Sequence, residues 1–168
     1  GCTRVNVFAG LKNFNQLLLQ EKKTVINFPK TWVKINIGET GFFRTAYSRE
    51  LLERLRGPIE KKILKAEDRL GIIRDLFALS EAGTIPTTDA LKLLKSYKNE
   101  ENYTVWVELA SGLGRLEQIL AKTKEKVALN DLILELFSPL SKSLGWEKKE
   151  GELHTNALLR SLAISRAG

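Results

Sequence analysis

The sequence has little of the chemistry that catalysis usually needs. It contains no methionine, one cysteine (Cys2) and one histidine (His154). A lone cysteine excludes an internal disulfide framework and is typical of a reducing compartment, so we expect a cytoplasmic location. A zinc site needs three or four ligands, mostly His and Cys at close spacing, and this chain cannot supply them. Phosphate-binding loops, dinucleotide fingerprints and Asp-rich calcium loops are also missing. We therefore predict no catalytic residue, no metal ligand and no bound cofactor in this chain.

Long hydrophobic runs are absent as well. No apolar stretch approaches the length that spans a bilayer, and no signal peptide is visible, so we predict no membrane partner. Hydrophobic residues make up 43% of the chain and charged residues 28%, which is typical of a soluble globular protein. Because the chain begins Gly1-Cys2 and has no methionine, we expect that it was processed, tagged or cut from something larger, and we favour the last of these.

Basic residues are in excess but are not clustered. There are 27 Lys and Arg against 20 Asp and Glu, a net charge of +7. Lys22-Lys23 and Lys61-Lys62 are pairs, whereas a nucleic-acid footprint needs runs with interleaved aromatics or a known module. We interpret the excess as an ordinary solvated surface and predict no nucleic-acid partner; a basic nucleic-acid binder ranks third among the functions considered.

The most patterned stretch predicts a β-hairpin. Trp32–Ile37 alternates apolar and polar residues with a period of two, which favours a half-buried strand. Gly38–Gly41 can reverse the chain, and Phe42–Tyr47 alternates again. Ser48 can then cap a helix that begins near Arg49.

Shorter β-type patterns precede this hairpin. Thr3–Ala9 alternates like a strand, and Gly10–Gln16 is predicted to be a loop. Leu17–Leu19 and Thr24–Phe28 are further β-type runs. We therefore predict that residues 1–47 belong to an antiparallel β-sandwich. Because four or five short strands hardly close a sandwich, this one is either complete as it stands or lacks strands that lie upstream.

From Ser48 onward the hydrophobic period changes to that of helices. Glu50–Arg56 predicts a short helix that stops at Gly57, with Pro58 opening the next turn. Ala66–Glu81 is a strong helix with Gly83 in its C-terminal capping position. Further helices are predicted after a cap at Thr87 or Thr88, from Trp106 to Leu120, from Leu129 to Leu144 with Pro139 inside, and from Glu152 to Arg166. Their short connections predict a superhelix of stacked, HEAT-like helix pairs over residues 48–168.

Several motifs in this order resemble a known family. They are Trp32-Val-Lys-Ile-Asn36, Gly41-Phe-Phe-Arg44, Tyr47-Ser48, the segment Ala66–Gly83, Asn99-Glu-Glu-Asn-Tyr-Thr-Val-Trp106, Phe137-Ser-Pro139, Leu144-Gly-Trp146, and Gly151-Glu152 with His154 and Leu158-Leu-Arg160. From about Leu17 to Gly168 the chain resembles M1-family zinc aminopeptidases, nearest to the puromycin-sensitive group. Phe43 departs from that pattern, which usually has tyrosine there.

The resemblance implies a non-catalytic role. Family enzymes remove N-terminal residues from peptides with a zinc ion held by His-Glu-x-x-His and a downstream Glu, and a Gly-Ala-Met-Glu-Asn segment grips the substrate amine. None of these motifs occurs here. The zinc would therefore belong to an upstream catalytic domain, which is one expected partner, with peptide substrates as the other. Residues 1–47 would end the sandwich domain and residues 48–168 would begin the helical domain that walls the substrate chamber.

Individual residues carry two interpretations each. His154 and Arg160 are the candidates for facing substrate, although a structural hydrogen bond for His154 and a salt bridge with a neighbouring helix for Arg160 are the commoner roles. Arg44 is expected to pair with a carboxylate across the sheet–helix boundary, and Asp68 and Arg69, near a helix start, are expected to be cap and ion-pair residues. Trp106 is expected in the core.

A second function stays open at this point. A free-standing helical-repeat scaffold that binds another protein through its concave face would show the same helical patterns. The reading frame upstream of Gly1 separates the two: a His-Glu-x-x-His motif favours the enzyme, and a start codon favours the scaffold.

Overall fold

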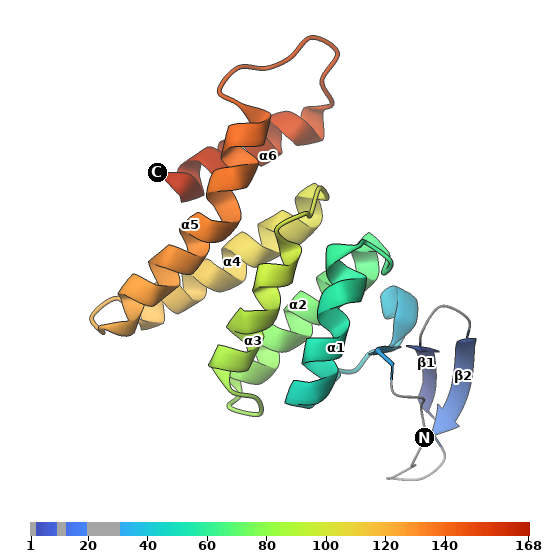
Figure 1. Cartoon of the computed structure of the whole chain (residues 1–168). Coiled ribbons are helices and arrows are strands. Elements are labelled where there is room, and N and C mark those ends of the chain that lie inside the picture. The colour runs from blue at the N-terminus through green and yellow to red at the C-terminus, as the bar shows by residue number, and fades with distance from the viewer. Residues whose placement is uncertain (1–2, 10–12, 20–30) are drawn as a thin grey trace. The chain divides into compact units, whose positions relative to one another are not determined.

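The computed structural model describes residues 3–9, 13–19 and 31–168 (Figure 1). The predicted run Thr24–Phe28 lies outside the described residues. The chain divides into two compact units, Gly1–Ser96 and Tyr97–Gly168, and each is described here by itself.

The first unit opens with a three-stranded antiparallel sheet. Its order is β2-β1-β3, with β1 at Thr3–Ala9, β2 at Asn13–Leu19 and β3 at Val33–Ile35. The strand predicted over Thr3–Ala9 is confirmed. The predicted loop over residues 10–16 is wrong in its second half, because β2 already begins at Asn13 and pairs with Ala9. Asparagine disfavours strands on its own, but cross-strand pairing overrides so weak a preference.

A sandwich requires two sheets packed face to face, and the described residues form one sheet. The sandwich therefore stays a prediction.

The predicted hairpin over residues 32–47 is wrong. Strand β3 covers three residues and pairs with β1, and a 3₁₀ turn, η1 (Ile37–Glu39), follows it directly. Residues 42–47 form no strand. Their alternation has another cause: Thr45 and Tyr47 are buried, and the N–H of Thr45 donates to a helix carboxylate 30 residues away instead of to a neighbouring strand.

Three helices complete the first unit. They are α1 (Arg49–Glu60), α2 (Ala66–Glu81) and α3 (Thr87–Leu94), and a second 3₁₀ turn, η2, covers Lys95–Tyr97. Ser48 caps α1 as predicted, since its hydroxyl accepts from the N–H of Leu51. The bounds predicted for α2 are confirmed, and Gly83 after it has a left-handed φ of 68°.

Helix α1 is longer than its sequence predicts. It passes through Gly57 and Pro58 and ends at Glu60. The proline removes one backbone hydrogen bond, but Leu55 and Ile59 lie on the same buried face, so continued helix keeps both in the core. The predicted threonine cap of α3 is also wrong: Pro86 occupies the N-cap position. The Thr87 hydroxyl instead accepts a hydrogen bond from Ser80 at 2.7 Å.

The second unit consists of α4 (Tyr103–Ile119), α5 (Glu125–Leu144) and α6 (His154–Ala167). Asn102 caps α4 by accepting from two backbone N–H groups. Trp106 is fully buried as predicted, with its ring centroid 4.9 Å from that of Phe137 on α5. Its indole N–H donates to the backbone oxygen of Glu100, which satisfies the one polar atom of the side chain. Helix α6 packs against both α5 and α4.

From α1 onward the described chain is helical, which fits an all-α C-terminal region. A superhelix of HEAT-like pairs would include helices of both units, so it stays a prediction. The domain boundary at residues 47/48 also stays a prediction. None of the helices in the described ranges is long and apolar enough to cross a membrane.

Candidate functional site

Residues 36–47, called the strap below, form the most elaborate polar site in the first unit. They connect β3 to α1, and η1 at their start contacts α2. Three residues of α2 hold the strap: Asp68, Gly71 and Asp75. Their spacing of three and four places them on one face of the helix.

Asp68 holds the start of the strap. Its carboxylate, 1% exposed, accepts from the N–H of Gly38 at 2.7 Å. Burial raises the pKa of Asp68, and the hydrogen bond from Gly38 opposes that shift in part. The predicted role as a helix cap is therefore wrong, because the carboxylate serves the strap and not the first turn of α2.

Gly71 allows Glu39 to lie against the helix. A Cβ at Gly71 would come within 2.0 Å of the Glu39 carboxyl carbon. The same carboxylate accepts from the Lys34 ammonium at 2.6 Å, and that ammonium also donates to the backbone oxygens of Ile35 at 2.7 Å and Asn36 at 3.3 Å. Lys34 is 1% exposed, so all three donors of a buried cation have acceptors. Burial raises the pKa of Glu39, and Lys34 offsets part of that effect.

Asp75 holds the end of the strap. One carboxylate oxygen accepts from the N–H of Thr45 at 2.9 Å and the other pairs with Arg44 at 3.3 Å. This confirms the predicted partner type for Arg44, a carboxylate on a helix. Tyr47 closes the strap: its buried hydroxyl accepts from the N–H of Ile35 at 2.9 Å, and burial raises the pKa of that hydroxyl.

The middle of the strap is closed on itself. The Asn36 carboxamide accepts from the N–H of Gly41 at 2.7 Å and donates to the oxygen of Gly41 at 3.0 Å. Asn36 and Glu39 both have left-handed φ values, 60° and 52°, which are uncommon for residues with a Cβ. The Phe43 ring lies over Gly41, whereas Phe42 is fully exposed at 109%.

His154 and Arg160 both lie in α6, and the structure gives them different surroundings. His154 is the first residue of α6 and is exposed, and its imidazole has no hydrogen-bond partner among the described residues. The structural hydrogen bond considered for it is thus absent from the described part. Arg160 is 6% exposed; its guanidinium pairs with Glu152 and donates to the backbone oxygen of Leu144 at 3.4 Å. The expected salt bridge is present, but its partner lies in the loop before α6.

The same ion pair affects Glu152. The hydrogen bond from Arg160 is the main reason that the pKa of Glu152 lies below its ordinary value. The pair joins the end of α5, the α5–α6 loop and α6 into one arrangement. Whether His154 or Arg160 faces substrate stays a prediction.

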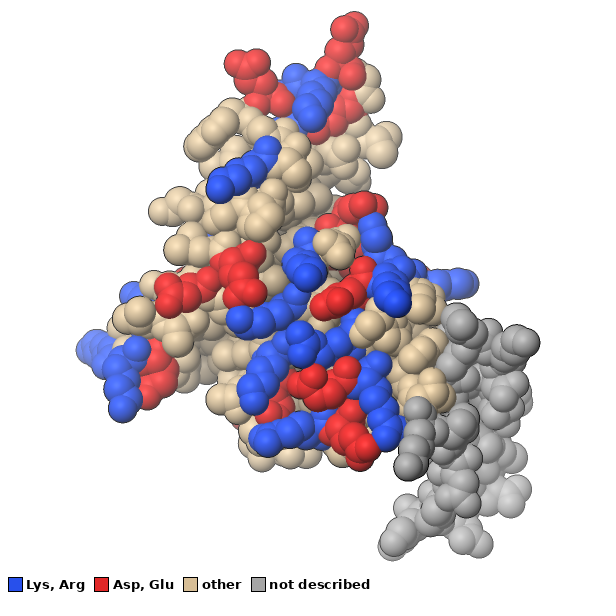
Figure 2. All heavy atoms as spheres, in the orientation of Figure 1, with Lys and Arg blue, Asp and Glu red and all other residues tan. Residues whose placement is uncertain are grey.

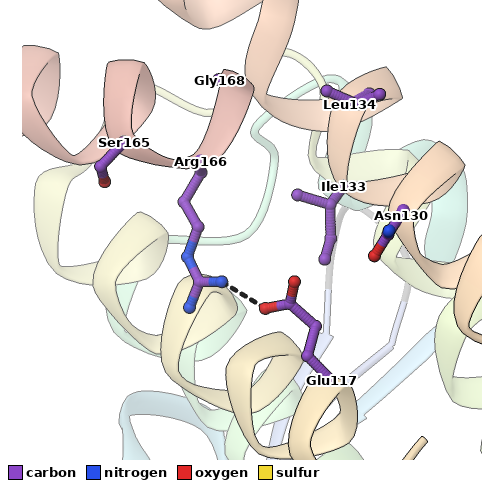
Figure 3. A pocket seen from close by; sticks show the side chains of 7 residues that line it. All are labelled: Glu117, Asn130, Ile133, Leu134, Ser165, Arg166 and Gly168. Atoms are coloured by element: carbon purple, nitrogen blue, oxygen red, sulfur yellow. Dashed lines mark hydrogen bonds and ion pairs between the residues drawn. The ribbon is translucent and has the colours of Figure 1, made fainter. Parts of the chain in front are cut away.

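A pocket of about 280 Å³ lies beside the end of α6 (Figure 3). Arg166 points across it to Glu117 on α4, and its second terminal nitrogen donates to the oxygen of Ala110 at 2.7 Å. A Cβ at Gly114 would come within 2.6 Å of that nitrogen, so the glycine provides the space through which Arg166 reaches α4. Since its guanidinium already has two acceptors on α4, we infer that Arg166 holds α6 against α4.

Charges on the face seen in Figure 2 are mixed. Lys and Arg side chains lie next to Asp and Glu side chains over the helices there, with no single-sign area. Ion pairs among the described residues include Arg56 with Glu53 and Arg49 with Asp89. Within the described ranges, no group of three or more His, Cys, Asp or Glu is placed to hold a metal ion.

Comparison with known families covers the strap and all six helices. The model of the family described as "ERAP1-like C-terminal domain" matches residues 32–168. The chain belongs to the ERAP1-like C-terminal domain family. The match begins at Trp32, so β3 and the strap fall within the family region together with α1 to α6.

Curated relatives of this ERAP1-like domain are named aminopeptidases. "Aminopeptidase M1-A" of Oryza sativa subsp. japonica is 35% identical over 136 residues, which is 80% of this chain and 16% of the relative. "Puromycin-sensitive aminopeptidase" of Caenorhabditis elegans is 30% identical over 162 residues, 91% of this chain and 17% of the relative. "Aminopeptidase M1" of Arabidopsis thaliana is 34% identical over 142 residues, 83% of this chain and 16% of the relative. The M1-family resemblance is confirmed, and the chain spans about a sixth of the length of these relatives.

Sequence reasoning missed most of the strap. Lys34 and Glu39 were not singled out, and neither were Gly71 and Asp75. One signal was available: Asp68, Gly71 and Asp75 recur at spacings of three and four, which places these three residues on one face of the predicted helix.

Proposed function

We propose that this chain is a non-catalytic C-terminal segment of an M1-family zinc aminopeptidase that removes N-terminal residues from peptides. The observation that carries the proposal is the family match over residues 32–168 combined with relatives that are named aminopeptidases. In this proposal the zinc ion belongs to a catalytic domain elsewhere in the parent enzyme. The segment meets peptide substrates only as a part of the parent enzyme. We propose that this enzyme is cytoplasmic.

The segment would act by shaping the substrate chamber. Residues 1–47 would end a β-sandwich domain, and residues 48–168 would begin a superhelix of HEAT-like helix pairs that forms part of the chamber wall. The antiparallel sheet β2-β1-β3 and the helical chain from α1 onward support this division. A fixed wall limits which peptides fit and how they are oriented toward the reacting atoms.

His154 and Arg160 are the residues proposed to face substrate. The exposed imidazole of His154 is free to donate to or accept from a peptide group. Arg160 is paired with Glu152, so a peptide carboxylate would have to compete with that glutamate for the guanidinium fork. We therefore propose that His154 contacts substrate directly, and that Arg160, which also holds the α5–α6 loop through Glu152, binds a peptide carboxylate only in exchange for that glutamate.

The proposal is tested by the coding sequence and by activity. The coding sequence joined to Gly1 should contain His-Glu-x-x-His with a downstream Glu. The parent protein should bind one zinc ion and hydrolyse aminoacyl test substrates, whereas the 168-residue chain should do neither. A coding sequence without the motif, or stoichiometric zinc with turnover in the 168-residue chain alone, would show that the proposal is wrong.

A further inference from the structure

Phe42 stands out because the backbone on both sides of it is held by hydrogen bonds while its own side chain is fully exposed. On one side of it, Asn36 ties Gly41 through two hydrogen bonds. On the other side, Asp75 holds Thr45 and Arg44. Between these attachments the Phe42 side chain is fully exposed.

An exposed apolar side chain alone needs no explanation, since single ones are common on protein surfaces. Phe42 differs from a residue such as Val127, which is simply on the outer face of a helix. Two strap residues, Asn36 and Glu39, have unfavourable left-handed conformations, and the buried cation Lys34 of β3 pairs with Glu39. Together they hold this short irregular stretch in one conformation. An aromatic side chain on a backbone that is already ordered loses little conformational freedom on binding, and such residues often dominate the affinity of interfaces.

We propose that Phe42 is an anchor that docks into an apolar pocket on the part of the parent polypeptide outside residues 1–168. This inference rests on the proposed function. The rest of the parent polypeptide is the expected partner surface, because the relatives are about six times longer than the stretch they share with this chain.

Arg44 gives the pocket a second requirement. One guanidinium nitrogen pairs with Asp75, yet 54% of the side chain is exposed. The exposed part of this guanidinium can therefore bind a carboxylate at the pocket rim, close to the apolar centre that receives Phe42. A partner surface with an apolar centre and an acidic rim complements both side chains.

Site-specific cross-linking tests the contact directly. A photo-reactive phenylalanine analogue is placed at position 42 in the parent protein and in the 168-residue chain, and the products are mapped by mass spectrometry. We expect an intramolecular product in the parent whose second site lies outside residues 1–168, and no such product in the isolated chain. A product confined to residues 1–168, or no product in the parent, would overturn the proposal.

Two substitutions provide an independent measurement. In the 168-residue chain, F42A and F42D should leave the urea midpoint of unfolding unchanged, because the side chain is exposed there. In the parent, both substitutions should raise the rate of amide hydrogen exchange in the strap by about tenfold or more, because burying a phenylalanine side chain contributes at least that factor. The matched control is W146A, which removes another exposed aromatic side chain, on the α5–α6 loop, and should leave exchange at the strap unchanged. Equal effects of F42A and W146A at the strap, or none from F42A in the parent, would contradict the anchor role.

Failure of this inference is distinguishable from failure of the proposed function. A parent with the zinc motif and activity but no contact from position 42 leaves the proposed function intact and removes the anchor. A parent of other chemistry with a contact outside residues 1–168 removes the aminopeptidase and keeps the anchor. A coding sequence that ends at these 168 residues would remove both.

Discussion

Replacement of Gly71 by alanine is the sharpest test of how the strap is held. A methyl group at this position would lie 2.0 Å from the Glu39 carboxyl carbon and 2.1 Å from one of its oxygens, so the carboxylate has to move. Its movement breaks the 2.6 Å contact with Lys34, which is 1% exposed and would be left with two backbone acceptors.

The expected magnitude follows from opposing effects. Loss of a charge-assisted hydrogen bond costs about 1.5–3 kcal/mol. Glu39 is 30% exposed, so water can compensate in part and the lower half of that range applies. Some of the strain at the left-handed Glu39 is also relieved when the turn relaxes. Alanine in place of glycine within a helix contributes up to about 1 kcal/mol in the opposite direction, and a displaced strap adds the loss of its other contacts. We expect G71A to lower the free energy of unfolding by about 1–2 kcal/mol.

The assay is urea unfolding of the 168-residue chain followed by circular dichroism, with hydrogen exchange resolving the two units. The matched control is G57A in α1, where a new Cβ would meet nothing within 4 Å. G57A should be neutral or stabilising by up to about 1 kcal/mol. Exchange should rise in β3, the strap and α2 of G71A, and should stay unchanged in α4 of the second unit.

A double-mutant cycle decides the cause. In an E39A background the carboxylate that collides with the new methyl group is gone, so G71A should become neutral or stabilising, as G57A is. If G71A destabilises by the same amount with and without Glu39, the collision is not the reason. If G71A alone is as stable as the unmodified chain, the close approach of Glu39 to α2 has no energetic weight.

Three further predictions concern Glu39, Arg166 and His154. Because burial raises the pKa of Glu39, the folded state binds its proton more readily than the unfolded chain does; stability from this group is greatest below its ordinary value of 4.5 and declines as the pH rises through the raised value. The unmodified chain should therefore lose stability relative to E39Q as the pH rises. A difference in unfolding free energy between the two that does not change with pH would contradict this. R166A should destabilise the 168-residue chain by about 1–2 kcal/mol in urea unfolding, and R166K should recover only part, because lysine cannot reach Glu117 and Ala110 together with one planar fork; full recovery would show that charge alone matters. If the proposed function holds, H154A in the parent protein should raise KM for long peptides several-fold and leave that for short aminoacyl substrates unchanged, and an equal change for both would argue against contact between His154 and long peptides.

The sequence predicts the helices better than the strap. Residues Ala66–Glu81 repeat apolar side chains with the helical period and are followed by a glycine with left-handed φ, so local signals alone define α2. Helix α1 was predicted too short, because Gly57 and Pro58 are local stop signals that the burial of Ile59 outweighs. Here a tertiary contact decides the outcome of a local preference.

The strap could not be predicted from local pattern, because its partners are distant in sequence. Thr45 and Asp75 are 30 residues apart, and so are Gly38 and Asp68. The alternation over residues 42–47 is the same whether alternate residues face a second strand or a helix. The pair Arg166 and Glu117 is separated by 49 residues and has no motif of its own, so only the packing of α6 against α4 reveals it.

Tyr47 has a consequence for the behaviour of the protein in concentrated solution. Strand β3 lies at one side of the described sheet, and a strand in that position usually offers free N–H groups to other molecules. The hydroxyl of Tyr47 already accepts from the N–H of Ile35, so a strand from a neighbouring molecule can pair with Ile35 only by displacing a buried aromatic side chain. An oxygen atom that the chain supplies twelve residues later thus occupies one of the donors through which this border could pair with another molecule.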